Sequence, residues 1–139
     1  MQNPRVGVGI IITSGQEILL AQRKNSHGEG TWTTAGGHLE LYEDVLSAAV
    51  RETEEETGIL LNTNNIRELG FTQDIFEQEN KHYITCFLSC ELDKTVVKPK
   101  IVEPDKFSSE WIWFNVRNLP TPVFIPVTNA LKKFRDQLF

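Results

Sequence analysis

Glutamates crowd into one short stretch of the chain, where residues 52–56 read ETEEE. Residues 43–57 contain no Pro or Gly and are rich in Ala, Leu, Glu and Arg, and a glycine follows them where helix C-caps are common. We therefore predict one helix over residues 43–57. In that helix Glu52 and Glu56 stand one turn apart on the same face, with Glu55 beside them.

The helix face that carries Glu52 and Glu56 also carries Val45, Ala48 and Ala49. An apolar stripe of this kind packs on the core, where an unpaired carboxylate costs several kcal/mol. A divalent cation would resolve the conflict, because Mg²⁺ prefers oxygen ligands and is commonly bound by one or two carboxylates together with substrate phosphates. The glutamates therefore indicate a metal site that receives a phosphate compound.

The alternative interpretation is a solvated acidic face, stabilised by pairs of charged side chains one turn apart. Arg51 and Glu54 are expected to point to the opposite, wet side of the helix. Solvation therefore accounts for only part of the acidic cluster.

The glutamates belong to a longer pattern in residues 37–59, GHLELYEDVLSAAVRETEEETGI. It contains a glycine, five residues, a glutamate, seven residues, Arg-Glu, and then Glu-Glu, one residue, a glycine and an aliphatic residue. This pattern resembles the Nudix box, the signature of hydrolases of nucleoside diphosphates linked to another moiety. Two positions depart from the family pattern: Thr53 stands where an aliphatic residue is usual, and Ala35 where a proline is usual. Neither residue is a proposed ligand.

The resemblance implies a metal centre that binds Mg²⁺, for which Mn²⁺ can substitute. The metal ligands it implies are a carbonyl of the glycine pair, assigned here to Gly37, and the side chains of Glu52, Glu55 and Glu56. Glu52 and Glu55 are the candidate catalytic residues, because a metal-bound water attacks phosphorus and an adjacent acid can act as its general base. Glu43 is expected to orient Arg51 or another residue of the box, and the alternative is that it holds a second ion through water.

Strand-like segments flank the predicted helix. Residues 6–13 and 17–23 predict a hairpin of buried strands, and residues 67–78 and 82–92 predict a second hairpin. A short strand over residues 110–114 precedes a final helix over residues 127–138, whose apolar face would cover the sheet. We expect a single domain over residues 1–139 of the α/β class, built as an α/β/α sandwich around a mixed β-sheet, which is also the fold that the Nudix resemblance implies.

Candidate substrate contacts lie on both sides of the box. Arg23 closes a strand and suits a phosphate, although a solvated strand end is an equal alternative. Tyr83 either lines a base pocket, as the resemblance implies, or packs at the edge of the core. Trp111 or Trp113 could stack on a base. The predicted substrate-binding residues are Arg23, Thr34, His38, Tyr83, Thr85 and Trp113.

Residues 93–109 form a long predicted loop, and loops of this length in a compact domain are commonly functional or mobile. In many relatives an acid in such a loop supplies a further metal ligand or the general base, so that Glu103 and Asp105 are candidates. The alternative is that both acids only solvate the loop. His27, in an earlier loop, is expected to be exposed to solvent, and contact with the substrate is the alternative.

The composition is that of an ordinary soluble globular chain, with 139 residues and a net charge of −5. The acidic balance argues against polynucleotide binding, which favours a basic patch, but not against a nucleotide that arrives with its metal ion. The sequence shows neither a long apolar segment nor a signal peptide, so we expect a cytoplasmic protein that does not bind membranes. Cys86 and Cys90 are expected to be reduced core residues. A homodimer is one arrangement that the sequence leaves open.

The segments VGVGIIIT, GGHLE, RETEEE, HYIT and VEPDK are similar to those of MutT-like nucleoside triphosphate diphosphatases, especially members that act on thiopurine and other modified (d)NTPs. The resemblance implies hydrolysis of a (d)NTP to a (d)NMP and pyrophosphate, which would clear modified nucleotides. ADP-ribose or a dinucleotide is the alternative substrate. The alternative of another class is a Nudix-fold module that binds a nucleotide without cleaving it; such modules are expected to lose box carboxylates, which this chain keeps.

Overall fold

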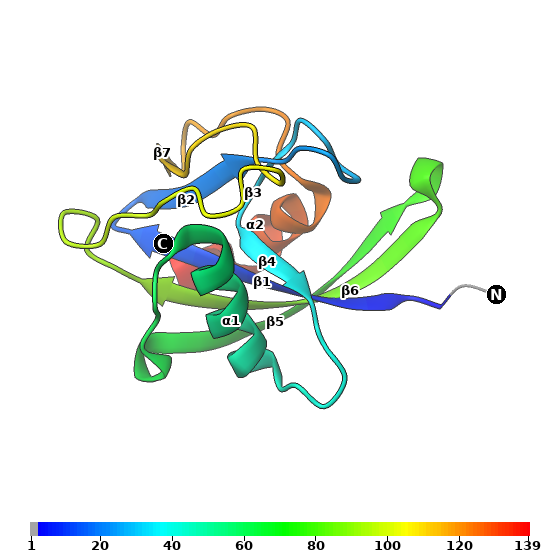
Figure 1. The fold of residues 1–139 in the computed structure, drawn as a ribbon, viewed down its shortest axis with the longest axis horizontal. Helices are drawn as coiled ribbons and strands as arrows, with labels where there is room; N and C mark the ends of the chain where they lie inside the picture. The colour runs from blue at the N-terminus through cyan, green and yellow to red at the C-terminus, as the bar shows by residue number, and fades with distance from the viewer. Residues whose placement is uncertain (1–2) are drawn as a thin grey trace.

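A computed structural model describes residues 3–139, which fold around one seven-stranded mixed sheet (Figure 1). The strands are β1 (Arg5–Ser14), β2 (Glu17–Gln22), β3 (Trp32–Thr33), β4 (Ala35–His38), β5 (Ile66–Phe76), β6 (Lys81–Glu91) and β7 (Ile112–Asn115). The helices are α1 (Val45–Thr57) and α2 (Ile125–Leu138), with short 3₁₀ turns η1 (Thr63–Asn65) and η2 (Glu77–Glu79). The predicted α/β class and mixed sheet are confirmed.

The central strand of the sheet is β1, which pairs in parallel with β6 on one side and antiparallel with β4 and β2 on the other. The register places Gly7 opposite Thr85 of β6 and opposite His38 of β4. Both predicted hairpins are confirmed, as β1 with β2 and β5 with β6. The central strand therefore joins the segment that leads into α1 to the second hairpin.

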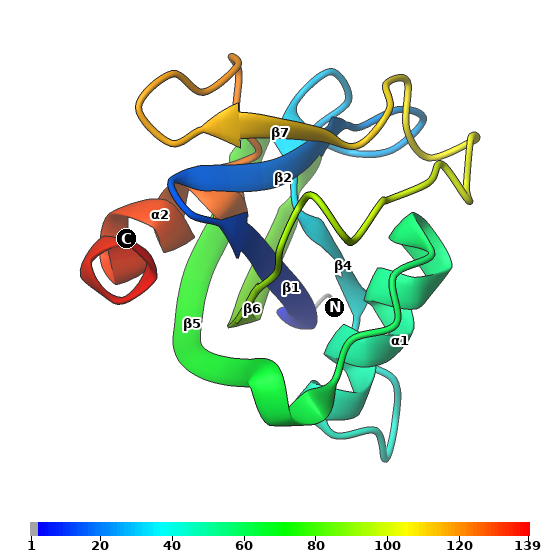
Figure 2. The same cartoon turned by 90° about the vertical axis from the view of Figure 1, so that its left-hand side faces the viewer.

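Two apolar clusters lie on opposite faces of the sheet, because successive side chains of β1 point to alternate faces. Ile10 and Ile12 pack with Ala48 and Ala49 of α1, whereas Ile11 packs in the second cluster under α2. Figure 2 shows the two helices on either side of the sheet. The α/β/α arrangement follows from this alternation.

Helix α1 begins two residues later than predicted, because Asp44 serves as its N-cap and its carboxylate accepts a hydrogen bond from Ser47 N at 2.8 Å. Gly58 ends the helix in the left-handed conformation with a φ of 75°, as expected of a C-cap glycine. The predicted final helix is confirmed as α2, with Leu131 and Phe134 buried. No helix within residues 3–139 is long and apolar enough to cross a membrane.

The strand predicted over residues 110–114 is displaced toward the C-terminus, since β7 covers Ile112–Asn115. Trp111 precedes it and is buried beside Phe107 in the cluster under α1. The predicted long loop is confirmed over residues 92–111, which contain no helix or strand. Cys86 and Cys90 are free thiols; Cys90 lies in the core as predicted, whereas Cys86 is only half-buried.

Candidate active site

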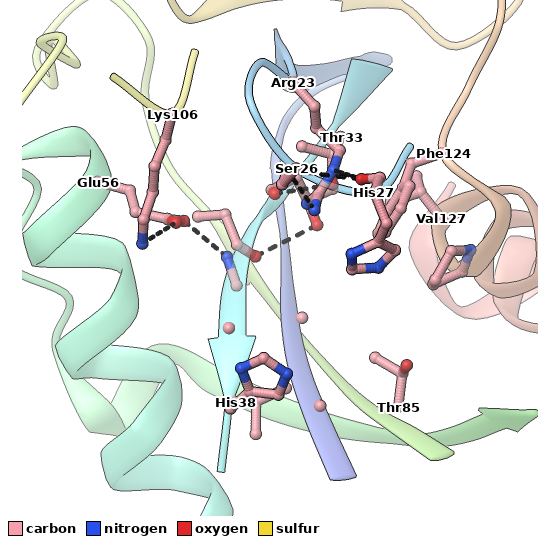
Figure 3. Close-up of a pocket in the computed structure, with 18 of the residues that line it drawn as sticks. Arg23, Ser26, His27, Thr33, His38, Glu56, Thr85, Lys106, Phe124 and Val127 are labelled. Atoms are coloured by element: carbon pink, nitrogen blue, oxygen red, sulfur yellow. Dashed lines mark hydrogen bonds and ion pairs between the residues drawn. The ribbon is translucent and has the colours of Figure 1, made fainter. Parts of the chain in front are cut away.

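A cavity of about 580 Å³ opens between the C-terminal half of α1 and the start of α2. Its floor is formed by β1 and β6, where Gly7 and Gly9 lie beside Thr85 and Phe87. Figure 3 shows Glu56 and Lys106 at one side and Phe124 and Val127 at the other. We call the side with Glu56 and Lys106 the charged wall. The side with His27, Tyr83 and Phe124 is the aromatic wall.

Glu56 is the most enclosed acid of the charged wall, with only 3% of its surface exposed. Its Oε1 accepts a hydrogen bond from the Gly36 backbone N–H at 2.8 Å. Burial raises the pKa of the Glu56 carboxyl to about 8, although the Gly36 N–H opposes this shift, and the Glu52 carboxylate raises the pKa further. A cation placed here would therefore find a carboxylate that lacks solvent and has few competing donors.

Glu52 lies one turn earlier and is also buried. Its Oε1 accepts a hydrogen bond from Arg51 Nη1 at 2.9 Å, whereas Oε2 is enclosed without a hydrogen-bond partner. The carboxylate packs against Gly37 so closely that a Cβ on that glycine would lie 2.3 Å from Glu52 Oε1. A side chain at position 37 would therefore displace the Glu52 carboxylate, which gives a physical reason for the glycine in the sequence pattern.

Arg51 was expected on the wet side of α1, and that prediction is wrong. Its guanidinium folds back over the acids and binds Glu43 through two hydrogen bonds, Nε to Oε2 at 2.7 Å and Nη2 to Oε1 at 2.9 Å. It also lies 3.4 Å from the half-exposed Glu55. The long side chain can reach across the helix surface, which helical spacing alone does not reveal. Glu43 orients Arg51 as predicted, and Glu54 is exposed.

The donors of this wall fit a divalent cation, although within residues 3–139 no three His, Cys, Asp or Glu side chains are grouped as a formed metal site. The fit rests on the unpartnered Oε2 of Glu52, on the buried carboxylate of Glu56 and on the space left by Gly37. Hard oxygen donors of this kind suit Mg²⁺ or Mn²⁺. Two protein cations, Arg51 and Lys106, contact these carboxylates instead.

The sequence analysis did not identify Lys106, which reaches the acids from the long loop. Its Nζ lies 3.8 Å from Glu56 Oε2 and 3.5 Å from Glu103 Oε2. Glu103 is half-buried, and its Oε1 has no hydrogen-bond partner. Asp105 lines the rim of the cavity but is exposed. In the sequence Lys106 is indicated only by its place in the segment VEPDK, beside the candidate acids Glu103 and Asp105.

Lys106→Met is expected to enlarge the rise in melting temperature that millimolar Mg²⁺ produces, by a few degrees. The ammonium repels an incoming cation and partly neutralises Glu56 in its absence, so that removing it destabilises the metal-free protein and favours the metal-bound one. Thermal melts with EDTA and with Mg²⁺ measure both effects. Lys132→Met, on the exposed face of α2, is the matched control. An unchanged Mg²⁺ response in the Lys106 variant would contradict this.

The predicted substrate residues are brought together, with one exception. The cavity is lined by Arg23, Thr34, His38, Tyr83 and Thr85. Trp113 is the exception, since it packs partly buried against the core cluster under α1 and pairs with Leu19 of β2. Its ring is taken up by core packing, so the prediction that it contacts substrate is not supported.

The aromatic wall contains a residue that was predicted to be exposed. His27 is half-buried and stacks on Tyr83 with ring centroids 5.4 Å apart and planes 4° from parallel. Burial, with the nearby Arg23 charge, lowers the pKa of His27 to about 4, so that the ring is neutral at physiological pH. Tyr83 is buried and its hydroxyl lies 3.0 Å from His38 Nε2. Tyr83 thus packs in the core cluster under α2 and also lines the cavity.

Arg23 is held in place at the junction of the two walls. Its Nε donates to the His27 carbonyl at 2.9 Å, and its guanidinium lies 4.1 Å from the Phe124 ring centroid. Burial lowers its pKa, but the charge of Glu56 opposes this effect. The residue therefore places a fixed positive charge between the acids and the aromatic rings.

A family model of the NUDIX domain matches residues 3–137 of this chain. The chain belongs to the NUDIX family. The crystal structure of a MutT NUDIX hydrolase from Burkholderia pseudomallei has a TM-score of 0.86 and 31% sequence identity, covering 95% of this chain and 98% of that one. The acids of α1 thus lie within a NUDIX domain.

Curated relatives of this NUDIX domain are diverse. An ADP-ribose pyrophosphatase of Methanocaldococcus jannaschii is 30% identical over 88% of this chain and 68% of its own length. An m7GpppN-mRNA hydrolase of Xenopus laevis is 27% identical over 79% of this chain. The match spans only 41% of the Xenopus protein. Sequence similarity therefore identifies the domain family but does not identify the substrate.

Proposed function

We propose that this NUDIX domain is a Mg²⁺-dependent hydrolase of a nucleotide phosphoanhydride, which converts a (d)NTP to a (d)NMP and pyrophosphate. The observation that carries the proposal is the cavity in which the carboxylate of Glu56, one turn after the buried Glu52 on α1, lies opposite an aromatic wall of Tyr83 and Phe124, with Arg23 also in the lining. The charged wall suits a metal-bound triphosphate, and the aromatic wall suits a base. Clearance of modified nucleotides is the role that we propose for this activity.

The residues divide the chemistry among them. When bound, Mg²⁺ neutralises charge on the phosphate oxygens and lowers the pKa of the attacking water. Glu52, Glu56 and the Gly37 carbonyl would hold the ion, with Glu55 at its exposed side. Arg51 binds Oε1 of Glu52 and leaves Oε2 free to face the ion. The proton of the attacking water would pass to a nearby acid, for which Glu52, Glu55 and Glu103 are the candidates. A P–O bond forms to that water, the anhydride P–O bond breaks, and pyrophosphate leaves.

ADP-ribose is the second candidate substrate, favoured by the similarity to the Methanocaldococcus jannaschii ADP-ribose pyrophosphatase. The same walls would bind its adenine ring and diphosphate. A binding module without hydrolysis is less well supported, because the box carboxylates are present and two of them are buried.

Incubation of the purified protein with a panel of nucleotides and Mg²⁺ tests the proposal. Release of pyrophosphate from triphosphates is the expected result, and release of AMP from ADP-ribose would identify the second candidate. Glu54→Gln, on the exposed face of α1, should retain full activity. Tight binding of nucleotides without any release of product would overturn the proposal in favour of the binding module.

Glu103→Ala is expected to lower kcat by at least about tenfold and to change KM less, if the half-buried acid acts on the metal-bound water rather than on binding. Its unpartnered Oε1 and its place beside Lys106 support such a role. Asp105→Ala, at the exposed rim, provides the comparison. Steady-state kinetics of both variants measure the split. Full kcat in both would return the role of general base to Glu52 or Glu55.

A further inference from the structure

Asp74 of β5 is a fully buried acid that the proposed reaction does not use. Within residues 3–139 no Lys, Arg or His side chain forms an ion pair with it. Its carboxylate accepts three hydrogen bonds instead, from Thr72 Oγ1 at 3.0 Å, Thr85 Oγ1 at 2.6 Å and Asn129 Nδ2 at 2.9 Å. Strand β5, strand β6 and helix α2 each contribute one donor, so that a buried acid is satisfied without a cation.

The carboxylate determines which way the Thr85 hydroxyl points. An ionised carboxylate only accepts hydrogen bonds, so each neighbour must act as a donor. The distance of 2.6 Å between Thr85 Oγ1 and Asp74 Oδ2 is typical of a hydroxyl that donates to a carboxylate. The Thr85 hydroxyl has a single hydrogen, which it uses in the hydrogen bond to Asp74. Its oxygen lone pairs remain as acceptors for any other partner.

Thr85 forms part of the cavity floor. It lies opposite Gly7 of β1, and a Cβ on that glycine would come within 3.5 Å of Thr85 Oγ1. The glycine thus leaves space beside the hydroxyl. Figure 3 shows Thr85 at the base of the cavity, away from Glu56 and Lys106. Thr72 is the cross-strand neighbour of Thr85 and bonds to the same Asp74 oxygen, but it does not line the cavity.

We propose that Asp74 holds Thr85 as an obligate hydrogen-bond acceptor and thereby selects a nucleobase that presents an exocyclic amino group to the cavity floor. The inference rests on the proposed function, because it assumes that the cavity receives a nucleotide. Asp74 is a positioning residue, and Thr85 is the residue that touches the base. A base with a carbonyl or no substituent at that point would leave the Thr85 oxygen without a donor.

Calorimetric binding of nucleoside monophosphates without metal tests the selection independently of hydrolysis. GMP and IMP differ by one amino group, as do AMP and purine riboside 5′-monophosphate. The wild-type protein is expected to bind the amino-bearing member of at least one pair about tenfold more tightly, the factor for one hydrogen bond and an unsatisfied acceptor. Equal binding within both pairs, or no binding of any of the four, overturns the inference.

Four variants locate the cause of the preference. Thr85→Val, which removes the acceptor but keeps the shape, should reduce the preference to less than about threefold. Thr85→Ser keeps the hydroxyl and should retain the preference. Thr72→Val is the matched control, because it removes a donor from the same carboxylate outside the cavity and should keep the preference. Asp74→Ala frees the Thr85 hydroxyl to turn, so that the ratio of the two affinities should fall while the weaker ligand still binds.

The outcomes separate this inference from the proposed function. An unchanged preference in Thr85→Val would overturn the inference even if triphosphates are hydrolysed. A preference that Thr85→Val abolishes would support it even if no triphosphate is cleaved. Asp74→Ala that loses both ligands equally would show that Asp74 only supports the fold, a result that melting curves of the same sample would confirm.

Discussion

Glu56→Gln is expected to lower turnover by at least about 100-fold, the scale on which a single electrostatic group acts in a transition state. Glutamine keeps the shape of the side chain and can still accept the hydrogen bond from the Gly36 N–H. It removes the charge that a divalent ion requires. Steady-state kinetics with the preferred nucleotide and saturating Mg²⁺ measure the loss. Activity near that of the wild type in a folded variant would sink the metal assignment.

The same substitution is expected to raise stability at alkaline pH when metal is removed. The Glu56 carboxyl has a pKa of about 8 in the folded chain against a reference value of 4.5, so folding takes up a proton between these values. The stability of the metal-free wild type should therefore fall as pH rises through this range. Glutamine does not titrate, so the variant should not show this fall. Melting curves in EDTA at pH 5 and pH 8 measure the difference and also establish that the variant is folded.

Arg51→Met is expected to destabilise the metal-free protein by about 2–4 kcal/mol, because it leaves the buried Glu52 carboxylate without the one hydrogen-bond partner it has among residues 3–139. It also releases the paired hydrogen bonds to Glu43. Urea unfolding in EDTA measures the loss. Mg²⁺ should recover part of it, since a bound cation neutralises the same acids.

Arg117→Met is the matched control for Arg51, because Arg117 is exposed after β7 and should tolerate the change. An Arg51 variant as stable as this control would mean that the guanidinium contributes nothing to holding the acids together. In that case the box would depend on solvent and metal alone.

Spacing in the sequence is sufficient to predict α1 and its buried acids. Apolar residues and Glu52 with Glu56 recur at helical intervals, and the helix buries that face. Strand alternation likewise predicts both hairpins, because Val8, Ile10 and Ile12 of β1 enter the cluster under α1, whereas Ile11 enters the cluster under α2. These features depend on local periodicity, which is written directly in the order of residues.

Local spacing in the sequence does not predict how far a long side chain reaches or which distant segments pack together. Arg51 folds over its own helix, Lys106 approaches from a loop far along the chain, and His27 is half-buried against Tyr83. Trp113 was expected to contact the substrate because tryptophan can stack on bases. Instead, the register of β7 with β2 places Trp113 opposite Leu19, and its side chain packs against the core cluster under α1. Asp74 gave no signal at all, since its partners come from three separate elements.

The parallel pairing of β1 with β6 also determines when the cavity can first exist. Gly7 meets Thr85 only after the chain between them, including the whole of α1, has been made and closed into a large loop. Closing such a loop is entropically costly before its contacts form, which slows folding relative to helical domains. A nascent chain that lacks β6 has no floor on which a nucleotide could rest. Nucleotides should therefore slow the unfolding of the finished protein rather than guide its early folding.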